Sequence, residues 1–253
     1  MLKTFGLRGR DVPITVYGPR GTRALLGALG VVVGRVAYPL QVVELGPGES
    51  VGLEDYRIET FAVAHGTTAV GYALREDERP GRFDVSAAEA LGVPSGPLRG
   101  ALQRGEAVTL PDGRVVRPAD VLGAPRRGRT VVITGDTAPA ASVVEAAAGA
   151  DVLVHEATFL AEERARAKET GHSTAAEAAL VAREAGVGLL ALTHLSARYS
   201  VSEVAEEARA LFPQTVVPRD FDLLEVPLPE RGAPKLVARG GRRGPREDVG
   251  SAA

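Results

Sequence analysis

The chain of 253 residues contains no cysteine and no tryptophan. The absence of cysteine excludes disulfide bonds, thiolate metal sites and cysteine nucleophiles. Aromatic residues make up only 4% of the chain, so alanine, valine and leucine have to fill the core. The formal net charge is −2. Because the whole chain has no strong basic field, any binding to nucleic acid has to come from local patches.

Long apolar runs are missing as well. No segment approaches the roughly 20 apolar residues that span a bilayer. Met1 is followed by a mixed, polar stretch and not by the apolar core of a signal peptide. Hydrophobic residues (45%) and charged residues (25%) occur at levels typical of soluble globular proteins. We therefore expect a cytoplasmic protein with one large domain or two small ones.

Four short apolar runs share one layout, because each ends in a polar residue that is able to do chemistry. Short continuous apolar runs are typical of buried strands. In open α/β sheets, ligands bind beyond the strand ends, so these four ends are candidates for one common site. The runs are residues 58–64 before His65, residues 130–134 before Asp136, residues 151–154 before His155 and Glu156, and residues 189–193 before His194.

Helices are predicted between the later strands, which indicates an α/β fold. Thr174 with Glu177, and Ser200 with Glu203, have the spacing of capping boxes at helix starts. The predicted helices cover residues 139–148, 174–185 and about 200–212. In the first part of the chain, residues 14–17 and 40–45 look like strands, and residues 21–30 look helical.

Two segments differ from the rest in composition. Residues 80–129 are rich in glycine, proline and arginine, with little continuous apolar character, so we interpret residues 80–121 as an inserted arm. Residues 230–253 are rich in glycine and arginine, and we expect a disordered tail there.

The chain has only four histidines, and all of them lie at or near the ends of predicted elements. They are His65, His155, His172 and His194. Asp136 adds a carboxylate at the same level. Imidazole and carboxylate are the natural ligands of zinc, and two metal ions a few ångströms apart assist phosphodiester hydrolysis. A purely structural interpretation, with polar strand ends capped by glycine and threonine, stays open at this point.

Five sequence strings together resemble ribonuclease Z, the tRNA 3′-processing endonuclease family of the metallo-β-lactamase fold. They occur in that family's order, and the resemblance covers residues 1–228. A sixth string, Gly92-Val93-Pro94-Ser95-Gly96-Pro97, resembles the glycine-proline motif of the family's flexible arm. The five are Ala64-His65-Gly66, Thr134-Gly135-Asp136-Thr137, His155-Glu156-Ala157-Thr158, His172-Ser173-Thr174 and Leu192-Thr193-His194-Leu195-Ser196-Ala197-Arg198-Tyr199.

The resemblance implies a fold and a metal centre. The fold would be an αββα sandwich over residues 1–229, with the arm inserted at 80–121 and the tail at 230–253. By family analogy, His65 binds one zinc ion, Asp136 bridges two, and His194 binds the second, which gives two zinc ions per subunit. Manganese or iron also suits such ligands.

The same resemblance assigns His172 and Glu156 to catalysis. His172 would donate a proton to the leaving 3′ oxygen, since the pKa of histidine lies near the working pH. The alternatives are that His172 only begins a helix, and that Glu156 only orients His172.

The implied substrate is precursor tRNA, which water would cleave just after the discriminator base. The arm would grip the tRNA through phosphate contacts, although a solvated basic loop is the plainer interpretation, because acidic residues are interspersed. Arg198 would bind a phosphate, with a structural salt bridge as an equal alternative. The family usually forms homodimers in which one subunit's arm serves the other's active site. The candidate RNA-binding residues are Gly92, Pro94, Gly96, Pro97, Arg99, Arg104 and Arg198.

The sequence departs from the family in one respect. The family's main metal motif, His-x-His-x-Asp-His, has no counterpart, because His65 is the first histidine. That motif supplies the remaining ligands and the general base. We therefore expect a late start codon or truncated gene, an unpartnered sheet edge, and no activity from this chain alone. Two alternatives stay open: a noncatalytic RNA-binding remnant, and a related hydrolase acting on a small ester or lactone.

Overall fold

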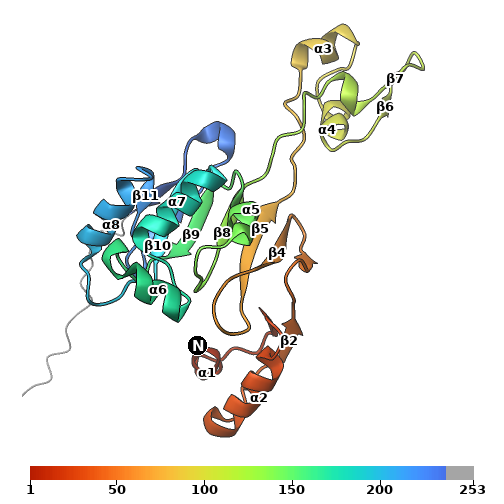
Figure 1. Cartoon of the computed structure of the whole chain (residues 1–253). Coiled ribbons are helices and arrows are strands. Elements are labelled where there is room, and N and C mark those ends of the chain that lie inside the picture. Colours follow the sequence, from red (N-terminus) through yellow and green to blue (C-terminus); the bar gives the residue numbers. More distant parts are fainter. Residues whose placement is uncertain (238–253) are drawn as a thin grey trace, which may run out of the picture.

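The computed structural model describes residues 1–237, which fold around one large mixed β-sheet (Figure 1). The strand order in the sheet is β11-β10-β9-β8-β5-β4-β3. The strands are β3 (Ser50–Gly52), β4 (Tyr56–Ala62), β5 (Val70–Glu76), β8 (Thr130–Ile133), β9 (Val152–Glu156), β10 (Leu189–Thr193) and β11 (Thr215–Val216). The sheet confirms the expected mixed α/β architecture and all four apolar runs as strands, and it adds β5, which the sequence did not predict.

The directions of the strands bring four strand ends to one edge. Strands β8, β9, β10 and β11 pair in parallel. Strand β5 runs antiparallel to both of its neighbours, β4 and β8. Strand β4 therefore runs in the same direction as β8, and the carboxyl ends of β4, β8, β9 and β10 meet at the same edge of the sheet.

Three helices cover one face of the sheet and form the main core with it. They are α5 (Ala141–Ala147), α7 (Ala175–Ala185) and α8 (Val201–Arg209). Both predicted capping boxes are present, with Thr174 and Ser200 as the N-caps of α7 and α8. Six buried residues of α7, five of them alanines, allow a close approach to the sheet. A shorter helix, α6 (Arg164–Thr170), precedes α7.

The other face of the sheet is covered in part by the C-terminal segment. Strands β12 (Leu223–Glu225) and β13 (Lys235–Val237) form an antiparallel hairpin that includes the short 3-10 helix η3 (Pro229–Arg231). Leu224 and Val226 pack against the second apolar cluster, at Val152, Leu189 and Ala191. The expectation of a tail starting at residue 230 is therefore wrong for residues 230–237, and residues 238–253 lie outside the described residues.

The first residues form a separate small unit. It contains α1 (Leu2–Leu7), β1 (Ile14–Gly18), α2 (Thr22–Val33) and β2 (Leu40–Glu44). Within residues 1–237, β1 and β2 pair only with each other, in parallel. The Tyr72 hydroxyl links this unit to the large sheet by donating to the carbonyl of Tyr17 at 3.1 Å. No helix among the same residues combines the length and apolar character needed to cross a membrane.

The inserted segment stands away from the sheet at the end of two connecting segments, and it has a small core of its own (Figure 1). We use "the arm" for residues 80–121, as in the sequence interpretation. Seven apolar side chains are buried within it, among them Val93, Leu102 and Val121. Its elements are α3 (Val85–Ala90), α4 (Pro97–Gln103), β6 (Val108–Thr109), β7 (Val115–Val116) and the 3-10 helix η1 (Pro118–Asp120).

The separate core predicts that the arm unfolds without the rest of the chain. Leu102 is fully buried, and Leu→Ala at such a site costs about 2–5 kcal/mol. In Leu102→Ala we expect amide hydrogen exchange to accelerate in the arm while protection in β8, β9 and β10 is retained. Equal acceleration in arm and sheet would contradict separate cores. Leu153→Ala, in the main core, is the matched control and should reverse the pattern.

Candidate metal centre

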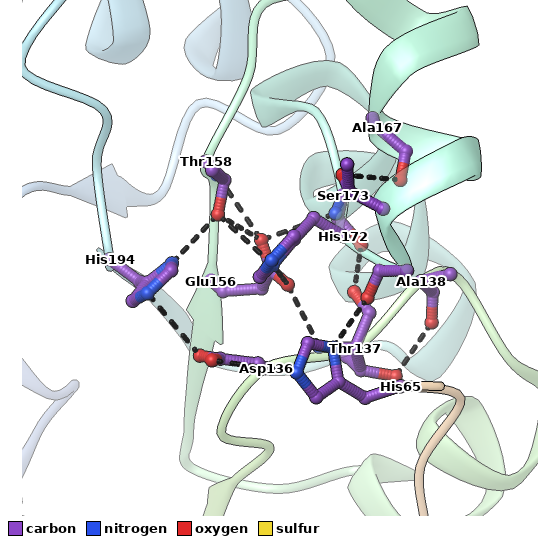
Figure 2. A network of polar contacts seen from close by, with 12 residues as sticks. His65, Asp136, Thr137, Ala138, Glu156, Thr158, Ala167, His172, Ser173 and His194 are labelled. Carbon is purple, nitrogen blue, oxygen red and sulfur yellow. Dashed lines mark hydrogen bonds and ion pairs between the residues drawn. The ribbon is translucent and has the colours of Figure 1, made fainter. Parts of the chain in front are cut away.

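The predicted site residues gather at the edge where β4, β8, β9 and β10 end (Figure 2). His65 follows β4, Asp136 follows β8, Glu156 is the last residue of β9, and His194 follows β10. His172 joins them from the loop between α6 and α7. The loops turn sharply here: Gly135 has a φ of 65°, and His194 has a φ of 54°, which is unusual for a residue other than glycine.

Asp136 lies between His65 and His194 with one carboxylate oxygen toward each ring. Its Oδ2 is 3.9 Å from His65 Nε2, and its Oδ1 is 3.7 Å from His194 Nε2. Both distances are too long for hydrogen bonds. Zinc binds imidazole nitrogen and carboxylate oxygen at about 2.0–2.2 Å. Each gap is therefore suited to one ion held between a histidine and a shared carboxylate.

The second ring nitrogen of each of these histidines has a protein partner. His65 Nδ1 donates to the carbonyl oxygen of Gly171 at 3.0 Å. His194 Nδ1 lies 2.8 Å from the hydroxyl of Thr158. That hydroxyl donates to Glu156 at 2.6 Å, so it accepts from the histidine. Both rings then keep their proton on Nδ1 and present the lone pair of Nε2, which is the arrangement found at metal-bound histidines.

His172 lies between the other two rings. Its ring centroid is 4.9 Å from that of His65 and 5.3 Å from that of His194, with the latter pair stacked at 14°. Ligand atoms of Asp136, His172 and His194 lie within 4.8 Å of one another. The structure therefore brings all five sequence-predicted chemical groups together: His65, Asp136, Glu156, His172 and His194.

The Glu156 carboxylate is almost completely buried, at 1% exposed. Its oxygens accept from the backbone N–H of Thr137 at 2.8 Å and from that of Ser173 at 3.2 Å. They also accept from the Thr158 hydroxyl and from His172 Nδ1, at 2.6 and 2.7 Å. A buried carboxylate with this many donors is held in one orientation. The geometry favours the alternative in which Glu156 orients His172.

Thr158 is the residue that the sequence interpretation missed. Its hydroxyl connects Glu156 to His194 and so couples the buried carboxylate to a candidate metal ligand. The signal was its position in the His155-Glu156-Ala157-Thr158 string, two residues after Glu156.

His155 does not join the site. It lies within β9, adjacent to Glu156 and so on the opposite face of the strand. Its ring is fully buried, and Nδ1 donates to the carbonyl of Glu156 at 2.8 Å. Nε2 has no partner within residues 1–237. Burial lowers the pKa of His155 below its usual value of 6.5.

Arg198 lies beside the site and is already paired. Its Nη2 is 3.3 Å from Glu163 Oε2, and its guanidinium lies over the Phe159 ring at 5.3 Å. Tyr199 donates to the same carboxylate at 2.6 Å. The geometry therefore supports the salt-bridge alternative for Arg198.

The two arginines of the arm that the sequence predicts to bind RNA also have acidic or carbonyl partners. Arg99, whose side chain is only 17% exposed, donates to the Val93 carbonyl at 3.0 Å and lies 3.6 Å from Glu89. Arg104 pairs with Glu106 at 2.9 Å. Among the other predicted arm residues, Gly92 and Gly96 have positive φ angles, and Pro97 begins α4, shortly after Pro94.

No family profile matches the chain, but individual proteins do. It is 48% identical over 235 residues to the ribonuclease Z of Gemmatimonas aurantiaca, with 91% of this chain and 75% of that protein covered. It is 50% identical over 233 residues to the ribonuclease Z of Myxococcus xanthus, covering 91% and 76%. The ribonuclease Z of Haloferax volcanii is 48% identical over 232 residues, covering 90% and 73%.

Two solved structures share the fold. The short form of human tRNase Z superposes with a TM-score of 0.56 at 21% identity, covering 87% of this chain and 70% of that one. A metallo-β-lactamase fold protein from Bacillus subtilis superposes with a TM-score of 0.52 at 19% identity, covering 82% and 63%. At these identities the structures establish the fold alone, and they agree with the expected metallo-β-lactamase architecture.

The lowered pKa of His155 predicts a pH-dependent stability. The unfolded chain protonates this histidine below about pH 6.5, whereas the folded chain protonates it only at a lower pH, so the unfolding free energy falls as the pH falls below about 6.5. The slope from this residue approaches about 1.4 kcal/mol per pH unit. Urea unfolding of wild type and His155→Asn between pH 5 and 7 measures it. Parallel slopes for the two proteins would contradict the burial argument.

The Thr158 hydroxyl predicts a metal-affinity effect. Thr158→Val removes the acceptor that orients His194, and loss of such a partner costs about 10- to 100-fold in affinity. Zinc affinity measured by chelator competition should fall by that factor. Thr109→Val, at an exposed arm position, is the control and should bind zinc normally. Equal affinities would show that the hydroxyl has no role in the site.

Proposed function

This chain belongs to the ribonuclease Z family, and from that premise we propose that it carries the metal-binding and RNA-cleaving centre of an endonuclease that removes 3′ trailers from tRNA precursors. The observation that carries the proposal is the placement of Asp136 between His65 and His194. These three residues would hold zinc. Such ions activate water and stabilise the charge that develops on the phosphate.

The chain's own residues prepare the site for proton transfer. Glu156 holds the Nδ1 proton of His172, so Nε2 is the ring atom left to exchange a proton with the substrate. His172 is 16% exposed, so it can be reached from solvent. We assign it the role of proton donor to the leaving 3′ oxygen, with Glu156 and Thr158 as positioning residues.

The arm is assigned to the body of the tRNA, away from the cut. It projects from the sheet at the end of two connecting segments (Figure 1). Because Arg99 and Arg104 are paired with acidic neighbours, we expect backbone contacts around Gly92, Gly96 and Pro97 to contribute beside them. Homodimerisation would bring the arm of one subunit to the site of the other.

A noncatalytic RNA-binding protein is the second candidate. One observation favours it: the sequence contains no His-x-His-x-Asp-His string. Three ligand residues cannot complete the coordination of two zinc ions, each of which usually takes four ligands.

The two candidates differ in a direct experiment. The 253-residue chain should bind zinc at fewer than two ions per chain, bind a tRNA precursor, and leave it uncut. The same chain extended at its N-terminus by a segment that carries the His-x-His-x-Asp-His motif should bind about two zinc ions and release the trailer. Metal-dependent cleavage by the shorter chain would overturn the expected inactivity. Failure of the extended protein to bind metal would favour the noncatalytic candidate.

The role of His172 has its own test in the extended protein. His172→Asn keeps the size of the ring roughly but removes the transferable proton, so we expect kcat to fall about 10²- to 10⁴-fold with unchanged zinc content. Single-turnover cleavage and metal analysis measure the two quantities. Glu169→Gln, at an exposed position of α6, is the control. A loss of zinc in parallel with activity would make His172 a ligand instead.

A further inference from the structure

Two connecting segments join the arm to the sheet, one before the arm and one after it. One carboxylate from the C-terminal part of the protein holds them together. Glu230 lies in η3 between β12 and β13. Its two oxygens accept from both terminal nitrogens of Arg79, each at 2.9 Å. Its Oε1 also accepts from Arg126 Nη1 at 2.9 Å. Arg79 lies on the connecting segment before the arm, and Arg126 lies on the connecting segment after it.

The arginines that Glu230 binds are themselves fixed to each other through the backbone. Arg79 and Arg126 form an isolated antiparallel bridge, with reciprocal N–H to carbonyl bonds of 2.8 Å. Arg126 Nε donates to the Pro80 carbonyl at 3.0 Å, and Arg79 Nη2 to that of Arg127 at 3.2 Å. Bidentate arginine–carboxylate pairs are among the stronger and more directional polar contacts in proteins.

The ion pairs keep their charge over the working pH range. Hydrogen bonds from Arg79 lower the pKa of Glu230 to about 2. The Glu230 side chain is 23% exposed, so solvent screens the contact only in part.

Two further arginines attach the connecting segment after the arm to the sheet. Arg127 pairs with Asp151 at 2.7 Å. Arg129 donates to Glu76 and to the Val226 carbonyl, the latter at 3.0 Å. Residues 126, 127 and 129 are all basic, and each has a separate acidic partner at the base of the arm.

Beyond this base, the two connecting segments approach each other so closely that no side chain lies between Gly81 and Gly123. A Cβ on Gly81 would lie 1.9 Å from the Gly123 carbonyl oxygen, so only glycine fits there. The next contacts are backbone ones, Gly123 N to Arg82 O at 2.9 Å and Asp84 N to Val121 O at 2.7 Å. The direction of the arm is therefore decided at the base, where Glu230 binds.

We propose that Glu230 is a positioning residue that fixes the direction of the arm relative to the metal centre, so that the C-terminal hairpin takes part in RNA binding. The first half stands on the contacts at the base of the arm alone. The second half, the effect on RNA, rests on the proposed function.

Distance measurements between the arm and the sheet layer test the first half. The chain has no cysteine, so two introduced cysteines carry the only spin labels. Val115→Cys in β7 and Leu180→Cys in α7 are exposed positions. Pulsed electron paramagnetic resonance should give a narrow distance distribution, and Glu230→Ala should broaden or shift it. Glu225→Ala, which removes an exposed pair with Lys235 on the same hairpin, should not.

Binding of a fluorescent precursor tRNA, followed by anisotropy, tests the second half. If only about one molecule in ten keeps the arm in the productive direction, the affinity falls about tenfold, and we expect this loss in Glu230→Ala with unchanged zinc binding. Glu230→Gln, which keeps the shape but not the charge, serves in its place if the alanine variant is unfolded by circular dichroism.

The outcomes separate the two proposals. An unchanged distance distribution in a folded Glu230 variant overturns the positioning role. A broadened distribution with unchanged tRNA affinity overturns the link to RNA binding. If the wild-type chain binds no tRNA, the proposed function fails while the distance measurement still decides the role of Glu230.

Discussion

The site depends on one buried carboxyl group. The Glu156 carboxylate is removed from water at the end of β9 and has to be satisfied by protein donors. Those donors come from three other segments: Thr137 after β8, Thr158 after β9 itself, and His172 with Ser173 before α7. Satisfying one carboxylate therefore fixes the loops that present Asp136, His172 and His194. The same parallel run of strands brings His65 to this edge from β4.

Different interactions determine the position of the arm. It has too little apolar contact with the sheet to be placed by packing, and its own core is closed within it. Directional charged contacts at its base, from Glu230, Asp151 and Glu76, take over that task. Surface ion pairs are individually weak. Here, however, they act on two connecting segments that already share backbone hydrogen bonds. A network of this kind sets orientation more than stability.

The sequence predicted the elements whose signals are local. Capping boxes at Thr174 and Ser200, and apolar runs ending in His65, Asp136, Glu156 and His194, were readable because spacing alone defines them. Strand β5 has no histidine at its end, only Arg75 and Glu76, and was missed. The arm's core was missed because Val93, Leu102 and Val121 are scattered along the chain and meet only through tertiary folding. The partners of Arg79, Arg126 and Glu230 lie more than 100 residues apart, so composition suggested a disordered tail and a basic patch where the structure has a specific contact.

The central claim is that His65 and His194 present Nε2 to metal ions shared by Asp136. X-ray absorption at the zinc edge of the zinc-loaded chain tests it most directly. The account predicts nitrogen and oxygen neighbours at about 2.0–2.2 Å with the scattering pattern of imidazole, which weakens in both His65→Ala and His194→Ala. A zinc spectrum without imidazole scattering, or one that neither substitution changes, would contradict it.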